Sequence, residues 1–392
     1  MKILYITPSI PNNFSRVRTL NLIKSFKYLG NDVDVISLYT KKNELKNLHA
    51  LEDVVNNIKI IKQPKILSYI NCAFGLLLPV PLQNSYVCNL YLHLYLLFTQ
   101  KKKNYDLIYI KRLRMAQYAK YFPKSKVYID FTDSLTKYYD RVKKVTHGFK
   151  KIINIEEYYK HFYYEIKIAK KYQSVICSEN DKKYLEQKHN IALNNMKIIY
   201  NTLDTKKWYV KNLKKKKEKI KLVFSGIFDY LPNILAAQYI IEKIFPLLPS
   251  KFSVTFVGKN VDKSLKSYAS DRIIFTGEVT DMKCELEKYD IFICPIQAGS
   301  GVKNKILQAG LVGLPIVTNE LGIEGIRKGF EKFVFFANTP EEFAEKIIYL
   351  SNKNINYRIK EQQQFIMKYY DYRKCTRCLL NEKNYTSLSS NK

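Results

Sequence analysis

The feature that most constrains the fold is an alternation of short strand-like runs with helical stretches, which is repeated in both halves of the chain. In the first half, runs rich in β-branched and aromatic residues lie at 2–7, 32–39, 106–110, 126–130 and 174–178. In the second half, similar runs lie at 221–226, 253–258, 272–277, 290–295, 315–319 and 333–337. Parallel strands need a crossover segment between them, and that segment is usually a helix. The pattern therefore predicts an α/β protein with two doubly wound, Rossmann-like domains.

The boundary between these domains is predicted at a change of composition just after residue 200. There KIIYNTLDTKKW is followed by VKNLKKKKEK, a solvated basic stretch of the kind that joins domains. A chain of 392 residues is long enough for two domains that each bury a core. We predict an N-terminal domain at 1–200, a linker at 201–219, a second domain at 220–370 and a C-terminal tail at 371–392.

The formal net charge of +31 indicates which partners the surface attracts. Only ten of the 66 basic residues are arginine, so lysine supplies most of the charge. Base readout and bidentate phosphate recognition favour arginine, and nucleic acid is therefore not expected as a partner. A lysine-rich surface instead favours solvent or an anionic membrane surface.

A segment without any charged residue lies between Lys65 and Lys101. Pro79 and Pro81 divide it into two apolar pieces, each shorter than the roughly 20 residues that span a bilayer. Packing in the core or contact with a membrane interface is therefore expected rather than a spanning helix. The start, MKILYITPSI, is strand-like and does not resemble a signal peptide.

The cysteine and histidine content bears on compartment and metal binding. Seven cysteines, an odd number, lie mostly in apolar runs, which fits a reducing compartment. Cys375 and Cys378 have no second pair or histidine cluster nearby, and the five histidines show no metal-binding spacing. We expect a cytoplasmic protein with no metal and no cofactor, and a peripheral position at the inner face of the cell membrane is a further expectation.

The most informative motif is the stretch CPIQAGSGVKNKILQAGLVGLPIVTN, residues 294–319. A strand leads into a Gly-Ser-Gly turn, and a helix is predicted to start near Val302 with Lys303 and Lys305 in its first turns. Free N–H groups at a helix start, together with two lysines, favour an anion such as a diphosphate. The alternative is a glycine turn that caps an ordinary helix. Three further strands end in Gly226, Gly258 and Gly277, which allows a ligand to approach the backbone closely.

Several of these stretches together resemble glycosyltransferase family 4. They are, in order, IYNTLDTKKW, SGIFDYLPNILAAQYIIEKIFPLL, FVGKN, FTGEVTDMKCELEKYDIFICP and GSGVKNKILQAGLVGLPIVTNELGIEGI. The first half is similar too, in MAQYAKYFPKSKVYIDFTDS and SVICSENDKKYL. The resemblance covers about residues 1–370 and is strongest to sugar transferases of bacterial exopolysaccharide systems. It implies the GT-B fold, in which two Rossmann-like domains face each other across a cleft.

The same resemblance implies a retaining transfer from a nucleoside-diphosphate sugar, which is bound as a substrate by the second domain. The residues that it assigns to donor binding are Ser225, Gly226, Asn233, Gly277, Glu278, Val279, Gly299, Ser300, Gly301, Val302, Asn304 and Gln308. The diphosphate is expected beside the first two and the 299–302 turn, and the base against 277–279. Lys303 and Lys305 are expected to act in catalysis, because negative charge builds on the leaving diphosphate.

One departure from the family pattern concerns its Glu-x7-Glu motif, which falls on Ser300 and Gln308. Gln308 stands where a glutamate is expected to hold the ribose hydroxyls. An amide still forms hydrogen bonds there but without the strength that a charge adds. This departure keeps a second hypothesis open, a non-catalytic GT-B protein that binds a sugar nucleotide or a partner. An epimerase on the same architecture is a third hypothesis, although no clear catalytic histidine or carboxylate pair supports it.

In the first domain, the resemblance implies a site for a glycan or lipid-linked acceptor. Ser15, Arg16 and Arg18 follow the first strand and are candidates for acceptor binding, with an ordinary helix start as the alternative. Asp130 and Asp133 lie at the end of another strand, where a carboxylate either binds sugar hydroxyls or caps the next helix. Of the two, Asp133 is the candidate for a catalytic role.

Overall fold

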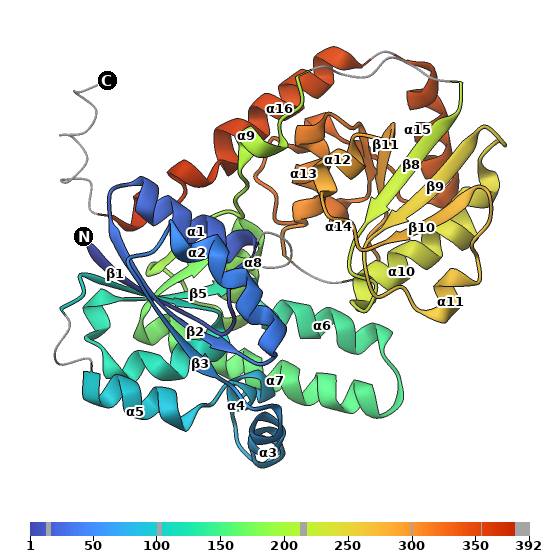
Figure 1. Cartoon of the computed structure of the whole chain (residues 1–392). Coiled ribbons are helices and arrows are strands. Elements are labelled where there is room, and N and C mark those ends of the chain that lie inside the picture. Colours follow the sequence, from blue (N-terminus) through green and yellow to red (C-terminus); the bar gives the residue numbers. More distant parts are fainter. Residues whose placement is uncertain (13–16, 100–103, 212–217, 299–300, 354, 381–392) are drawn as a thin grey trace, which may run out of the picture. The chain divides into compact units, whose positions relative to one another are not determined.

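The computed structural model divides the chain into two compact units (Figure 1). It describes residues 1–12, 17–99, 104–211, 218–298, 301–353 and 355–380. The first unit comprises Met1–Leu203 together with the C-terminal segment from Tyr372, and the second comprises Asp204–Asp371. The chain therefore passes from one unit to the other twice.

The first unit is built on a parallel sheet that has seven strands within the described residues, in the order β3-β2-β1-β4-β5-β6-β7. Its strands are β1 (Lys2–Thr7), β2 (Asp32–Tyr39), β3 (Asn57–Lys62), β4 (Leu107–Lys111), β5 (Val127–Thr132), β6 (Gln173–Ile176) and β7 (Met196–Ile198). Successive residues of β1 point to opposite faces, with Ile3 and Tyr5 in one core cluster and Leu4 and Ile6 in the other. The sheet is thus buried on both faces, as parallel sheets usually are.

Helices cover both faces of this sheet. Its α-helices are α1 (Val17–Tyr28), α2 (His49–Glu52), α3 (Lys65–Leu76), α4 (Leu82–Tyr86), α5 (Leu90–Thr99), α6 (Leu135–Val145), α7 (Gly148–Lys171) and α8 (Glu179–His189). The 3₁₀ segments are η1 (Lys42–Leu48), η3 (Leu113–Tyr121), η4 (Lys124–Lys126), η8 (Tyr372–Lys374) and η9 (Arg377–Leu379). Side chains of α1, α2 and η9 pack on one face, and those of α5, η3, α7 and α8 pack on the other.

The second unit has a six-stranded parallel sheet within its described part, in the order β10-β9-β8-β11-β12-β13. Its strands are β8 (Ile220–Ser225), β9 (Phe252–Val257), β10 (Ile273–Gly277), β11 (Ile291–Cys294), β12 (Ile316–Thr318) and β13 (Phe335–Phe336). Its α-helices are α9 (Thr205–Trp208), α10 (Leu231–Tyr239), α11 (Lys263–Lys266), α12 (Met282–Leu286), α13 (Asn304–Val312), α14 (Glu320–Ile323), α15 (Pro340–Asn352) and α16 (Asn356–Tyr370). A π-helical turn η5 (Ile240–Ile244) and the 3₁₀ turns η6 (Phe245–Leu247) and η7 (Glu331–Phe333) complete it.

Both sheets confirm the predicted parallel α/β architecture, and all eleven predicted strands are present within two residues of their expected positions. The pattern did not predict β3 and β7. Helix α9 lies in the range predicted to be a linker, and it belongs to the second unit. Residues 372–380, in the predicted tail, pack with the first unit, where Leu379 and Leu380 join a core cluster.

Each sheet has one position at which the strand order reverses. In the first unit this switch point lies between β1 and β4, and in the second it lies between β8 and β11. The loops that leave the two central strands there run in opposite directions, which opens a crevice at the carboxyl ends of the strands. Ligands of open parallel sheets bind in such crevices, so these two positions are where functional residues are expected.

Candidate functional site

The loops that follow β8, β9 and β10 in the second unit are held together through three glycines. Gly226 donates its N–H to the carbonyl of Val257 (2.9 Å), and Gly258 donates to the carbonyl of Gly277 (3.0 Å). Gly258 has a φ of 144°, and a Cβ built there would overlap the carbonyl oxygen of Gly226. A side chain at Gly258 is therefore excluded, and the backbones of the first two loops lie in direct contact.

Two of the residues assigned to donor binding, Gly226 and Asn233, come together with Lys305, which is assigned to catalysis, at the switch point of this sheet. Lys305, in the first turn of α13, donates from Nζ to the Oδ1 of Asn233 (2.7 Å) in the first turn of α10. The Nδ2 of Asn233 donates in turn to the carbonyl of Ile227 (2.9 Å). A Cβ on Gly226 would lie 2.8 Å from the Asn233 amide and 3.1 Å from the Lys305 Nζ. The absence of a side chain at Gly226 thus leaves room for the amide and the ammonium group beside the end of β8.

The charge of Lys305 lacks a carboxylate partner. Its hydrogen-bond acceptor is an amide, and its Nζ lies 4.1 Å from the centre of the Phe224 ring. No ion pair joins Lys305 to any Asp or Glu in the part of the chain that the structure describes. Burial lowers the pKa of Lys305 to about 8, and the nearby charge of Lys303 acts in the same direction. An anion bound beside Lys305 would stabilise its ammonium form, so this environment favours the binding of an anion.

The environment of Lys303 differs from that of Lys305. It occupies the N-cap position of α13, and its Nζ lies 4.0 Å from the Oε2 of Glu324. The helix begins at Asn304, two residues later than predicted, and Gly301 before it has a φ of 79°. The predicted Gly-Ser-Gly turn is only partly visible, because Gly299 and Ser300 lie outside the described residues.

Gln308 lies one helical turn after Asn304, so the two side chains share one side of α13. The Gln308 side chain is partly exposed, and it forms no hydrogen bond with any of the described residues. Its amide is thus available to a ligand, as the ribose assignment requires. That assignment stays a prediction.

The residues predicted to hold the base follow β10. Gly277 has a φ of 72°, and its carbonyl accepts the hydrogen bond from Gly258. Glu278 is exposed and forms an ion pair with Lys259 (3.3 Å), and Val279 is partly exposed. This segment is therefore connected to the Gly226 loop through Gly258.

In the first unit, the structure does not support Arg18 as an acceptor ligand. Its side chain is buried, and its guanidinium donates to the carbonyls of Ile199 and Tyr200 (both 2.8 Å). It also donates to the Oδ1 of Asn201 (3.1 Å) and to the Oδ2 of Asp130 (3.4 Å). These internal partners explain why Arg18 is buried, and we no longer assign it to acceptor binding. Ser15 and Arg16 lie outside the described residues.

Asp130 is the centre of a buried polar network rather than an exposed strand end. Lys111 Nζ (2.8 Å) and the Tyr109 hydroxyl (2.7 Å) donate to its Oδ2, and the N–H of Thr132 (2.7 Å) donates to its Oδ1. Burial alone would raise the pKa of Asp130, but the charges of Arg18 and Lys111 outweigh it and hold the pKa well below its usual range. Sequence patterns did not indicate Lys111, because a lysine within an apolar strand has no local signal of a distant partner.

Two residues beside this network adopt left-handed backbone conformations that are uncommon for residues other than glycine. Thr132 has a φ of 70° at the end of β5, and Arg112 has a φ of 73° directly after β4. Arg112 is exposed, and its N–H donates to the carbonyl of Asp130 (2.8 Å). Strained backbone often occurs at functional sites, and these residues lie at the carboxyl ends of two central strands.

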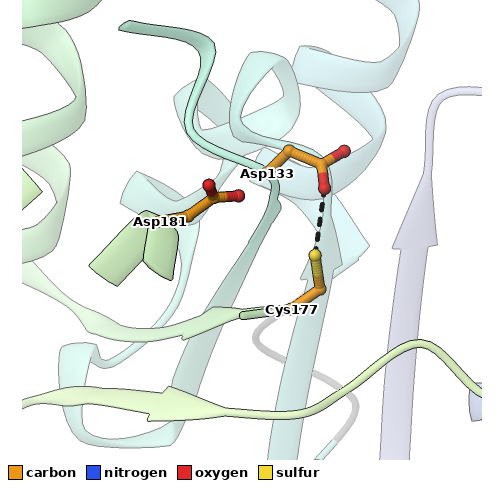
Figure 2. A group of neighbouring side chains, drawn as sticks. All are labelled: Asp133, Cys177 and Asp181. Carbon is orange, nitrogen blue, oxygen red and sulfur yellow. Dashed lines mark hydrogen bonds between the residues drawn. The ribbon is translucent and has the colours of Figure 1, made fainter. Parts of the chain in front are cut away.

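Asp133, the predicted catalytic carboxylate, lies beside two residues from the end of β6 and the start of α8 (Figure 2). The Cys177 thiol donates to the Asp133 Oδ1 (2.9 Å), and Asp181 forms an ion pair with Lys137 (2.9 Å). Burial, followed by the charge of Asp133, raises the pKa of Cys177 well above its usual value. The ligand atoms of the three residues lie within 4.8 Å of one another, but a thiol that keeps its proton is a poor metal ligand.

The family comparison concerns the unit that carries the Lys305 cluster. Residues 219–353 match the family model described as glycosyl transferases group 1. The match covers about a third of the chain and assigns this family to the second unit. A search of curated proteins finds no match to the sequence.

Solved structures show a likeness of fold that extends over the whole chain. HepE from Anabaena in complex with UDP and glucose aligns over 100% of both chains, with a TM-score of 0.66 and 15% identity. A TarM variant from S. aureus in complex with UDP, fondaparinux and α-GlcNAc-glycerol aligns over 97% of this chain and 99% of its own, with a TM-score of 0.69 and 11% identity. WaaG, a glycosyltransferase involved in lipopolysaccharide biosynthesis, aligns over 97% and 98%, with a TM-score of 0.64 and 10% identity. The fold is thus GT-B, as the sequence predicted.

Proposed function

We propose that the chain is a glycosyltransferase that transfers a sugar, with retention of configuration, from a nucleoside diphosphate to a glycan or lipid-linked acceptor. The transfer would be a step of cell-surface polysaccharide synthesis and would take place at the inner face of the cell membrane. The observation that carries the proposal is the cluster of Gly226, Asn233 and Lys305 at the switch point of the second sheet. The solved relatives that contain UDP support the choice of a nucleoside diphosphate.

The cluster has the properties that a diphosphate site requires. Gly226 lets the backbone approach the phosphates, and Lys305 supplies a positive charge that no described carboxylate neutralises. The first N–H groups of α13 add the positive end of a helix dipole beside it. When the bond between the sugar and the diphosphate breaks, negative charge grows on the leaving group, and these groups stabilise it in place.

Gln308 and the 277–279 segment extend the proposed donor site in two directions. Gln308, on the exposed side of α13, would bind the ribose through its amide. Gly277 and Val279 would contact the base, because the Gly258 bridge joins their loop to the phosphate loop. On the acceptor side, Asp133 remains the proposed catalytic residue, and its hydrogen bond from Cys177 fixes the orientation of the carboxylate.

Calorimetric titration with UDP, GDP and ADP tests the donor site. We expect one of the three to bind at a single site, and the corresponding nucleotide sugars to be hydrolysed slowly in the absence of acceptor. NMR of the released sugar then reports the anomeric configuration. If none of the nucleotides binds, the donor assignment is wrong.

A second function, binding of a sugar nucleotide without turnover, is favoured by one observation. Gln308 stands where the family pattern has a glutamate, so the site lacks one negative charge near the ribose. Binding of a nucleoside diphosphate with no release of the sugar from any donor, with or without acceptor, would support this second function.

A further inference from the structure

Helix α3 has the reverse of the polarity expected for a surface helix of a globular protein. Its side toward the protein carries small or polar residues, with Ser68 and Gly75 buried and Asn71 and Cys72 partly buried. Its outward side is apolar, and the exposed fractions are 77% for Ile66, 68% for Phe74 and 88% for Leu77 just after the helix. An amphipathic helix normally buries its apolar side, so this arrangement requires a separate explanation.

The small residues of α3 explain how the helix is held in this orientation. A Cβ on Gly75 would overlap the Ser85 hydroxyl, so α3 and α4 approach closely at this glycine. The Gln63 side chain donates to the Ser68 hydroxyl (2.9 Å), and Asn71 donates to the carbonyl of Cys88 (2.9 Å). These specific contacts fix which side of the helix faces outward.

Two neighbouring helices expose apolar residues as well. On α7, the large side chains that are exposed follow one another at intervals of three or four residues: Phe149, Ile152, Ile155, Tyr159 and Tyr163. On α5 they are Leu90, Tyr91, Leu94, Leu97 and Phe98. Such intervals place each set along one side of its helix.

The three helices lie along the same lower side of the first unit in Figure 1. The ammonium group of Lys160 on α7 donates to the carbonyl of Gly75 in α3 (2.9 Å). The hydrogen bond from Asn71 reaches the residue two positions before α5. We call the exposed apolar residues of α3, α5 and α7, with Leu77 and Leu78, the apolar face. It comprises 18 of the 29 large apolar side chains that are exposed among the described residues, and such a concentration is typical of an interaction surface.

The charge around the apolar face is mostly positive, and Glu156 of α7, which is partly exposed there, forms an ion pair with Lys160. No Asp or Glu occurs between Asp53 and Asp106, or between Asp140 and Glu156. Lysines do occur there, and Lys65, Lys144, Lys150 and Lys151 are exposed. Apolar residues beside lysines suit the boundary between the acyl chains and the headgroups of an anionic membrane.

A second copy of this chain is a poorer partner for the apolar face. In a two-fold dimer the same surface faces itself, which would bring lysines opposite lysines with few carboxylates to pair them. Spanning of a bilayer is also not indicated, because no helix among the described residues is long and apolar enough to cross a membrane. Helix α3 has 12 residues, which suits a position in the plane of the interface.

We propose that the apolar face docks on a bilayer that contains anionic phospholipid, with α3 and the Leu77–Leu78 segment inserted below the headgroups. This inference deepens the proposed function, since a lipid-linked acceptor is presented at such a surface. It makes membrane binding a property of the first unit and independent of the donor site.

Cosedimentation of the full chain with vesicles tests the proposal. One set contains phosphatidylcholine alone, and the other contains phosphatidylcholine and phosphatidylglycerol at 3:1. The wild type should bind the anionic vesicles more tightly, and added salt should weaken that binding. A fully inserted large apolar side chain changes partitioning about tenfold, so Phe74→Ser with Leu77→Ser should reduce binding by at least tenfold. Lys150→Gln with Lys151→Gln should reduce binding to anionic vesicles about fivefold per lysine.

The matched control for the apolar pair is Leu247→Ser with Tyr357→Ser, since these side chains are also exposed (45% and 77%) but lie in the second unit. The control pair should bind like wild type, and nucleotide titration should be the same for every variant. Unchanged binding of the Phe74 and Leu77 variant would overturn the proposal, as would a lack of vesicle binding by wild type. Dimers that form without lipid and are lost in the same variant would assign the apolar face to a second copy instead. If nucleotides fail to bind while vesicles do, only the proposed function fails.

Discussion

Donor binding should depend on pH through Lys305. The pKa of this lysine in the free protein is about 8, because burial and the charge of Lys303 disfavour the ammonium form. A diphosphate binds the ammonium form, so affinity should be constant below this pKa and fall as the pH rises through it. The protonated fraction at pH 9 is about one tenth of that at pH 7, and the affinity for the diphosphate should fall about tenfold over this interval.

Lys305→Met removes the charge and its hydrogen bond while keeping most of the length of the side chain. A hydrogen bond to a charged group contributes about 1.5–3 kcal/mol, so the variant should bind the preferred nucleoside diphosphate about 10- to 150-fold more weakly at pH 7. The pH dependence between 7 and 9 should disappear with it. Asn233 loses its charged partner in this variant but keeps its hydrogen bond to Ile227.

The assay is calorimetric titration at pH 7, 8 and 9 for wild type, Lys305→Met and the control Lys243→Met. Lys243 is an exposed lysine of the same unit, and its substitution should change neither affinity nor pH dependence. The second ionisation of a phosphate has a pKa near 6, so the diphosphate itself is fully charged over this range. A wild-type affinity that is flat from pH 7 to 9, or a Lys305→Met variant with the wild-type slope, would refute the role of Lys305.

Substitutions at three further positions test the geometry. Gln308→Glu should bind nucleoside diphosphate more tightly by roughly 1 kcal/mol and Gln308→Ala more weakly, because a carboxylate is the stronger acceptor for the ribose hydroxyls; equal affinities by calorimetry would remove Gln308 from the site. Gly258→Ala should lower the free energy of unfolding, measured by urea titration, by at least about 2 kcal/mol, because the Cβ of the alanine would overlap the Gly226 carbonyl. A change below about 0.5 kcal/mol, which is typical of a surface substitution, would contradict the contact between the loops. Asp130→Asn should cost about 3–5 kcal/mol of unfolding free energy, because it leaves the buried charges of Arg18 and Lys111 without their carboxylate; a loss below about 1 kcal/mol would show that the network is not ionised.

The sheets could be predicted from the sequence because most of their strands are buried on both faces. β1 and β2 begin and end at the predicted residues, since both are rich in β-branched and aromatic residues and nearly all of their residues are buried. β3 escaped prediction because it is an edge strand, in which lysine and asparagine interrupt the apolar run and only Ile61 is buried. β7 has three residues, too few to form a recognisable pattern.

Residues of the candidate site could be predicted only where the order of the strands brings them together. Gly226 directly follows β8, and Lys305 lies at the start of the helix that follows the neighbouring strand β11; parallel pairing brings the segments after such strands together whatever their separation in sequence. The environment of Arg18 could not be predicted, because its partners lie more than 110 residues away and no local pattern records them. The orientation of α3 could not be predicted either. The composition of this helix shows that it is apolar, but it does not show which side faces outward, because that depends on the close contact at Gly75.

The double passage of the chain between its units has a consequence for biosynthesis. The second unit is one continuous segment, whereas the first is completed by residues from Tyr372 onward, including Leu379 and Leu380 in its core. Thr376 also closes a buried hydrogen bond with Ser25 (2.8 Å), which lies 351 residues earlier. A chain emerging from the ribosome therefore holds an unfinished first unit until residues 372–380 are released, although most of that unit is synthesised first. Premature termination anywhere before residue 372 should thus leave a polypeptide whose N-terminal half exposes core surface and is prone to aggregation and degradation.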